Sequence, residues 1–201
     1  MRVSRIQAEK NRQTVINVAS RLFREHGFNG IGLKDLMKNA GLTQGAFYKQ
    51  FASKEDLAAQ ASNRAFEGAT DRWARVAAAN PENPLSAVVA FYLSADHRDE
   101  MADGCPIVSL GADAARQGSD VKASFEAGIK AHLEILSRWI GGADDEETRG
   151  KAMTILSTIV GAVVLSRAIN DEHLSKQVLQ SAAKNVLMRS SADNAQQGSI
   201  R

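Results

Sequence analysis

Residues 41–57 read GLTQGAFYKQFASKEDL and combine a turn, a short helix and the start of a longer helix. Gly41 is expected to end the preceding helix, because glycine adopts the left-handed conformation that closes helices without steric cost. The apolar side of the short helix, which we expect to be core, consists of Ala46, Phe47 and Phe51. Ser53 and Asp56 form a variant of the capping box, so a new helix is expected to begin beside them.

Two further helical patterns lie upstream of this stretch. Residues 15–23 carry apolar side chains at helical spacing before Gly27, and residues 33–40 repeat the pattern up to Gly41. Three short helices with a glycine turn before the third predict a helix-turn-helix. In such a unit the second helix supports the third, and the outer face of the third stays free for the major groove of DNA.

Side chains of the third helix are of types that bind DNA. We expect base edges to be reached by Thr43, Gln44 and Gly45, since a glutamine can pair with adenine through two hydrogen bonds. We expect phosphate to be contacted by Tyr48, Lys49 and Lys54. Residues 1–60 hold ten Lys or Arg against five Asp or Glu, a net charge of +5, whereas residues 61–201 have a net charge of −3. This basic segment fits a phosphate-binding surface.

Composition excludes several classes of protein. The chain has 201 residues, 44% hydrophobic and 24% charged, which is typical of a globular protein. With one cysteine it forms no intramolecular disulfide, and its four histidines have no metal-binding spacing, so no metal and no cofactor are expected. No signal peptide is visible, and the longest uncharged stretch, residues 152–166, is shorter than the ~20 residues that span a bilayer. We therefore expect a cytoplasmic protein that does not bind membranes.

Helical spacing continues along the rest of the chain, which predicts an all-α fold of about nine helices. After a polar connection at residues 96–104, a wide apolar surface appears in residues 148–170. Such a surface needs covering from two directions, so we expect a homodimer formed through residues 148–189. The expected organisation is a DNA-binding domain at 1–53, a ligand-binding and dimerisation domain at 54–189, and a flexible tail at 190–201.

The stretch at 41–57 closely resembles the recognition segment of the TetR/AcrR family of transcriptional regulators, and AxxLFREHGFNGIGLKDLMKNA at 19–40 extends the likeness. GCPIVSLGADAARQ, which begins at Gly104, is similar to a stretch found in one branch of that family. The resemblance implies a dimer of nine or ten helices per chain that binds a palindromic operator. It also implies a small-molecule pocket and a four-helix bundle between subunits.

Roles of single residues follow from the same resemblance. Thr43 matches a hydroxyl that caps the helix and contacts phosphate, Gln44 a variable base-reading position, and Tyr48 a phosphate-contacting tyrosine. Lys54 matches the lysine that touches the DNA backbone at the start of helix four. One departure stands out: Ile31 and Gly32 occupy the place where the family has Ser or Thr, and Lys34 is the candidate to replace that phosphate contact.

Aromatic and polar side chains of the second domain are candidates for the ligand pocket, although most of the aromatic residues are expected to be core. The candidates are Phe66, Trp73, Phe91, Tyr92, Cys105, Phe125 and His132. Together these observations predict a dimeric repressor, not an enzyme, that a small molecule releases from its operator.

Three alternatives remain open. Cys105 precedes Pro106, a residue that favours the first position of a helix, and a thiolate at that N-cap could sense oxidants or electrophiles. A thiol hydrolase would need Cys105 beside His97 or His132 and an orienting Asp. A dimeric scaffold that keeps the helix-turn-helix but binds only protein is the third.

Overall fold

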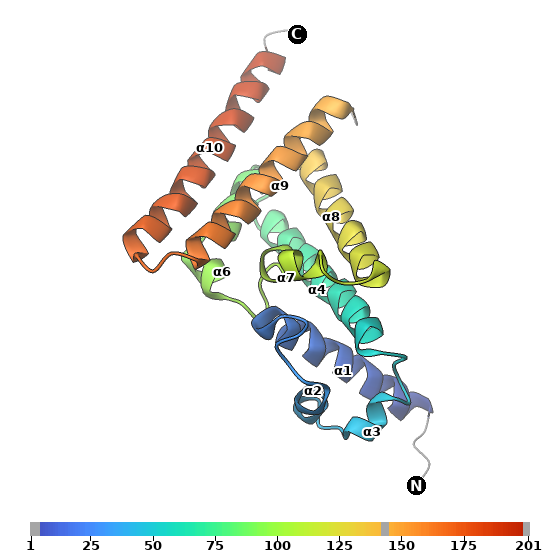
Figure 1. Ribbon diagram of the computed structural model, residues 1–201. Helices are drawn as coiled ribbons and strands as arrows, with labels where there is room; N and C mark the ends of the chain where they lie inside the picture. Colours follow the sequence, from blue (N-terminus) through green and yellow to red (C-terminus); the bar gives the residue numbers. More distant parts are fainter. Residues whose placement is uncertain (1–4, 142–144, 199–201) are drawn as a thin grey trace. The chain divides into compact units, whose positions relative to one another are not determined.

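The computed structural model describes residues 5–141 and 145–198, with side chains through Met188 (Figure 1). The described residues form ten α-helices and no strand, which confirms the all-α class. The helices are α1 Arg5–His26, α2 Leu33–Asn39, α3 Gln44–Phe47, α4 Lys54–Ala78, α5 Pro84–Tyr92, α6 Ala95–Asp99, α7 Pro106–Ala114, α8 Ser119–Ile140, α9 Glu146–Arg167 and α10 Glu172–Gly198.

The helix that the sequence pattern did not predict is α6, which lies in the expected polar connection. Its N-cap is Ser94, whose hydroxyl accepts a hydrogen bond from the backbone N–H of His97 at 3.1 Å. Asp96 lies in the first turn, where a negative charge favours the helix. The capping hydrogen bond of Ser94 thus favours a helix in a polar stretch that has no apolar periodicity.

Two helices differ in length from the expected ranges. α3 ends at Phe47, and in the turn that follows the N–H groups of Gln50 and Phe51 both donate to the Phe47 carbonyl, at 2.8 and 3.0 Å. α10 continues to Gly198, past the expected end at 189, since no proline or glycine interrupts it before that residue. The expected tail is therefore helical through Gly198, and its flexibility stays a prediction.

The helix ends that glycine and the capping box were expected to set are confirmed. Gly27 and Gly41 have φ of 77° and 71°. Ser53 accepts a hydrogen bond from the N–H of Asp56 at 3.0 Å, and the Asp56 carboxylate accepts one from the N–H of Ala52 at 3.0 Å. The turn from α3 into α4 is thus fixed by Ser53 and Asp56, the two residues of the expected capping box.

The chain divides into two compact units. One comprises the residues up to Ala69 together with Met101–Ile129, and the other comprises Thr70–Glu100 and the residues from Lys130 onward. This division does not coincide with the expected domain boundary after residue 53, because the first part of α4, all of α7 and the first part of α8 pack with the N-terminal helices. The functional boundary at 53 stays a prediction.

An aromatic core holds the first unit together. The Phe125 ring on α8 lies 6.5 Å from Phe28 and 5.1 Å from Phe66, in edge-to-face arrangements. Phe28 in turn packs 5.3 Å from Phe23 on α1. Residues far apart in the sequence therefore complete one core, of which the helix-turn-helix is a part.

Buried Arg24 joins α1 to the loop before α7. Its guanidinium donates to the carbonyl oxygens of Ser20 and Gly104, both at 2.8 Å, and lies 3.7 Å from the Asp103 carboxylate. Arg21 also pairs with Asp103, at 2.8 Å, but its side chain is 57% exposed. The same loop is thus held by one buried and one exposed arginine.

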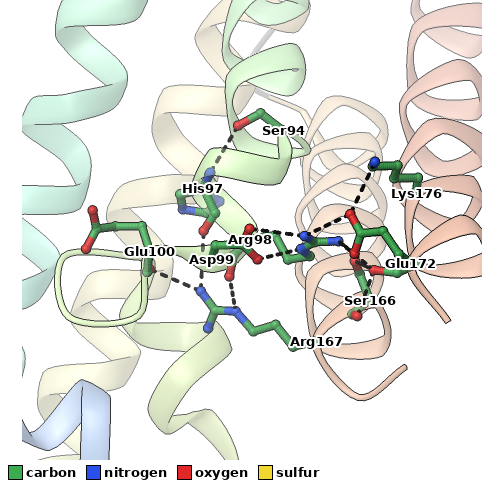
Figure 2. A network of polar contacts seen from close by, with 10 residues as sticks. Ser94, His97, Arg98, Asp99, Glu100, Ser166, Arg167, Glu172 and Lys176 are labelled. Carbon is green, nitrogen blue, oxygen red and sulfur yellow. Dashed lines mark hydrogen bonds and ion pairs between the residues drawn. The ribbon is translucent and has the colours of Figure 1, made fainter. Parts of the chain in front are cut away.

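In the second unit α9 and α10 run antiparallel, side by side, and a polar network joins them to α6 (Figures 1 and 2). Arg98 of α6 donates to Glu172 and Ser175 of α10, at 3.2 and 2.9 Å. Arg167 at the end of α9 donates to the carbonyl oxygens of Arg98, at 2.7 Å, and Glu100, at 3.2 Å. Hydrogen bonds from Arg98 lower the pKa of Glu172, so this network favours the ionised carboxylate.

Within the described residues, one helix, α9, is long and apolar enough to cross a membrane. The helix is longer than the uncharged stretch considered above, because charged residues at both ends extend it. In its most apolar window 39% of the residues are buried within the protein, and core helices of soluble proteins share this composition. The length and composition of α9 are therefore weak evidence for a membrane span.

We predict that Arg24→Met lowers the free energy of unfolding by ~2 kcal/mol, because it removes charged hydrogen bonds to buried carbonyl oxygens. The exposed pair is the matched control: Arg21→Met should cost under about 1 kcal/mol. Urea unfolding followed by circular dichroism measures both. Equal costs would show that the buried guanidinium has no special part in holding the loop to α1.

Candidate nucleic-acid interface

The helix-turn-helix is built on buried side chains from α2, α3 and the turn after α3. Leu36 and Met37 on α2 are fully buried, and Phe47 and Phe51 stack with ring centroids 5.4 Å apart. Leu42 in the connecting turn packs partly buried against the same core. The interpretation of both phenylalanines as core is confirmed, as is that of Leu42 as a plug between the helices.

Five of the residues predicted to bind DNA lie exposed together on and around α3. They are Thr43, Gln44, Gly45, Tyr48 and Lys49. Tyr48 is 67% exposed although its ring packs edge-on against Phe47, with 5.3 Å between the ring centroids. A Cβ built on Gly45 would have no atom within 4 Å, so the surface beside it is open. These residues form an outward face that a buried aromatic pair supports.

Thr43 occupies the N-cap position of α3 but does not cap it. Its φ and ψ are −85° and 154°, as at an N-cap, yet its side chain makes no capping hydrogen bond. The capping role that the resemblance implied for its hydroxyl is therefore wrong in this structure. The exposed hydroxyl is left available to a phosphate oxygen.

The start of α2 shows the consequence of replacing Ser or Thr by glycine. Gly32 is the N-cap, and no side chain caps the helix. Lys34 lies exposed on the first turn. Within the described residues neither Lys34 nor Lys49 forms an ion pair, so both ammonium groups can meet phosphate.

The structure does not place Lys54 with the exposed residues. Its side chain is half-buried, and its Nζ donates to the carbonyl oxygen of Ile31 at 2.7 Å. The ammonium lies 5.9 Å from the centroid of the Phe23 ring, and burial lowers its pKa. In this arrangement Lys54 binds the turn before α2.

Arg12 is a residue of this unit that the sequence analysis missed. Its guanidinium donates to Gln60 of α4 at 2.7 Å and lies over the Phe51 ring, 5.0 Å from the centroid. The signal was present in the sequence, because Arg12 shares a helical face with buried Ile16 and Phe23. Together with Arg24 and Lys54, it shows that the net charge of this segment overstates the charge presented to DNA.

The seven candidate pocket residues fall into two sets. Phe66, Cys105 and Phe125 belong to the first unit, and the second unit contains Trp73, Phe91, Tyr92 and His132. In the second unit the ring of fully buried His132 lies 4.6 Å from Trp73, and Tyr92 lies 5.8 Å from Trp73. Most of these residues are core, as expected.

His97 and Trp139 were not among the candidates but border the same aromatic cluster. Trp139 lies 6.0 Å from Trp73, and the His97 ring lies 4.5 Å from Tyr92. The His97 Nδ1 is 2.7 Å from the Tyr92 carbonyl oxygen. Burial lowers the pKa of His97 to about 4, so the imidazole is neutral at pH 7.

Cys105 is the N-cap of α7, and Pro106 is the first residue of that helix, as predicted. The cysteine is only 2% exposed, and no side chain caps the helix. Within the described residues no three His, Cys, Asp or Glu side chains gather at a possible metal site.

Comparison with known proteins agrees with this interface. A family model for bacterial regulatory proteins of the tetR family matches residues 15–61. The transcriptional repressor NemR of Escherichia coli is 25% identical over 130 residues, which are 63% of this chain and 65% of that protein. The transcriptional regulator LmrA of Bacillus subtilis is 24% identical over 161 residues, or 78% of this chain and 86% of that protein.

Solved structures share the fold. A TetR family regulator from Cytophaga hutchinsonii has a TM-score of 0.76 at 20% identity, covering 93% of this chain and 97% of that one. Escherichia coli NemR in its reduced form has a TM-score of 0.73 at 21% identity, covering 88% of this chain and 95% of that one. These findings support a TetR family transcriptional regulator, because the family model matches the helix-turn-helix segment and solved regulators of that family share the fold.

We predict different effects for two substitutions on the exposed face of α3. Gln44→Ala should cost ~1 to 3 kcal/mol on the preferred DNA sequence and little on scrambled DNA, if Gln44 reads a base edge as we expect. Tyr48→Phe should weaken binding to both, because a hydroxyl on phosphate carries no sequence information. Fluorescence anisotropy with duplexes selected from a random pool measures both effects. Equal losses on both DNAs for Gln44→Ala would show that Gln44 does not read bases.

Proposed function

We propose that the protein is a dimeric transcriptional repressor that binds a palindromic operator through α3 and is released by a small molecule. This proposal rests on the exposed residues on and around α3, which lie over the buried pair Phe47 and Phe51. All of them belong to the segment that the family model matches. A helix supported from beneath in this way presents its side chains to the major groove.

Each exposed residue has a part in this proposal. Gln44 reads a base edge, and Gly45 leaves open space for close approach of the DNA. Phosphates are bound by Thr43, Tyr48, Lys49 and, from the first turn of α2, Lys34. Two such heads that contact successive major grooves imply half-sites roughly 34 Å apart, centre to centre.

The dimer forms through residues 148–189 in this proposal. One side of α9 is buried in its own unit, where Ile159 and Val163 are fully covered. Large apolar side chains are exposed elsewhere on the last two helices. They are Met153, Val164 and Leu165 on α9 and Leu174 and Met188 on α10. A second copy of the same two helices would cover them as a four-helix bundle.

The small-molecule effector is proposed to bind near the aromatic residues of the second unit. Trp73, Tyr92 and His132 there combine flat apolar surfaces with polar atoms, as ligand sites do. The neutral His97 beside Tyr92 suits an uncharged or aromatic compound.

A thiol switch at Cys105 is the less favoured mechanism of release. The helix N-terminus would stabilise a thiolate, but a side chain that is 2% exposed gives an oxidant or electrophile little access. A pocket or core thiol agrees better with that burial.

As the named relatives are bacterial regulators of transcription, we place the action of this protein in the cytoplasm, where the DNA lies.

The experiment that tests the proposal is selection of duplexes from a random pool, followed by binding measurements at ~0.15 M salt. We expect a palindromic consensus that is bound ~10³-fold or more tightly than scrambled DNA. Recovery of no consensus, or equal affinity for both duplexes, would rule out a sequence-specific regulator and leave the protein-binding scaffold.

A further inference from the structure

Arg12 reaches from α1 to two parts of the chain near the end of α3. Its guanidinium lies over the buried Phe51 ring, 5.0 Å from the ring centroid. Its Nη1 atom donates to Oε1 of Gln60 on α4 at 2.7 Å. A guanidinium that stacks on a ring and donates from its edge is held in one place, because the two contacts fix different directions. The side chain of Arg12 is accordingly half-buried.

The hydrogen bond of Arg12 continues through α4 into the turn that precedes this helix. Nε2 of Gln60 donates to Oδ1 of Asp56 at 2.6 Å. The other oxygen of that carboxylate, Oδ2, accepts from the backbone N–H of Ala52 at 3.0 Å. We call these three hydrogen bonds, together with the contact of Arg12 on Phe51, the Arg12 relay.

The Arg12 relay meets the ring pair beneath α3. Phe51 stacks on Phe47, the last residue of α3, and the Phe47 ring contacts exposed Tyr48 edge-on. α3 has only four residues, so its own hydrogen bonds are few and its orientation depends on the side chains packed beneath it. A shift of the Phe51 ring would therefore move the exposed face of α3 as well.

We propose that Arg12 is a positioning residue for DNA binding: through the Arg12 relay it holds the turn after α3, and so it fixes the direction in which α3 presents Gln44 and Tyr48. This inference rests on the proposed function, because it assigns α3 to the major groove. Arg12 acts from within the protein, and the side chains that meet DNA are those of α3.

The ratio of the affinities for selected and scrambled duplexes separates positioning from other roles. A phosphate contact carries no sequence information, so its loss weakens both complexes equally. Partial unfolding also weakens both equally, because it lowers the amount of binding protein. Loss of the Arg12 relay weakens the selected complex more, since base reading needs a fixed α3. We expect Arg12→Met to lower the ratio roughly tenfold, the effect of losing one charged hydrogen bond.

Gln60→Met tests whether the effect of Arg12 passes through the Arg12 relay. Methionine is close to glutamine in length and leaves the charge unchanged, but it neither accepts from Arg12 nor donates to Asp56. Gln60→Met should lower the same ratio, by less than Arg12→Met because the contact on Phe51 remains. In the double variant the two losses should not multiply, since both changes break the same set of bonds.

Two results of these binding measurements would overturn the inference. The first is an equal loss on both duplexes for Arg12→Met with no effect of Gln60→Met, which would mean that the guanidinium contacts phosphate directly. The second is a pair of losses that multiply in the double variant, which would mean that the two residues act separately.

Lys10→Met is the matched control, because it removes the same charge from an exposed side chain of the same helix. We expect this change to leave the ratio of affinities as it is in the parent. A fall in the ratio as large as that of Arg12→Met would show that the charge of α1 alone matters, and it would overturn the inference.

Amide hydrogen exchange of the free protein tests the Arg12 relay without DNA. The Phe51 N–H donates to the Phe47 carbonyl oxygen at 3.0 Å in the turn after α3. Arg12→Met should speed exchange of the Phe51 amide roughly tenfold, whereas Lys10→Met should not, and neither should alter the Ile159 amide of α9. Unchanged exchange at Phe51 in Arg12→Met would overturn the inference even if the parent bound its operator. A parent that binds no duplex would end the proposed function, whatever the exchange showed.

Discussion

Phe125 packs between Phe28 and Phe66, and the arrangement of the first unit depends on this packing. A segment of about fifty residues buries little apolar surface and is only marginally stable alone, so residues from elsewhere in the chain enlarge its core. Leu110 and Ala114 of α7 and Val121 of α8 supply them. The exposed face of α3 therefore rests on a core filled by separate stretches of sequence, and its stability is not a property of the N-terminal helices alone.

Arginines hold the stretch that leads from the second unit back into the first. Near one end, Arg167 of α9 binds the carbonyl oxygens of Arg98 and Glu100. Near the other end, Arg24 of α1 binds the carbonyl oxygen of Gly104. Guanidinium groups suit this task, because several donors in a fixed plane can satisfy carbonyl groups that no helix or strand pairs. Each unit thus fixes its own end of the connecting segment.

The sequence predicted those features that short-range rules determine. Gly27 and Gly41 end helices, Ser53 and Asp56 start α4, and the alternation of buried and exposed residues around Phe47 follows from helical spacing. Features that depend on distant partners were not predictable in this way. The pattern places Lys54 in a motif, but only the folded turn at Ile31 shows which way its ammonium points.

The other features that the sequence pattern did not predict also depend on partners that are distant in the chain. α6 has little apolar periodicity, and its place is set by its Ser94 cap and by Arg98, whose partners lie on α10. The unit boundary differs from the expected one because Phe66, beyond residue 53, packs with the N-terminal core. Local pattern carries no information on such long-range packing. The pocket residues divide between two units for that reason as well.

The central claim is that two chains, joined through α9 and α10, bind one palindrome together. Native mass spectrometry of the protein with its selected duplex measures this directly, for the parent and for Leu165→Glu, which places a charge on a side chain that is 59% exposed on α9. We expect two 21.6 kDa chains per duplex for the parent. For the variant we expect single chains with greatly weakened binding, because a single chain contacts one half-site and lacks the contacts that a second chain makes with the other half-site. One chain per duplex at full affinity, or a variant that binds in pairs as tightly as the parent, would contradict the claim.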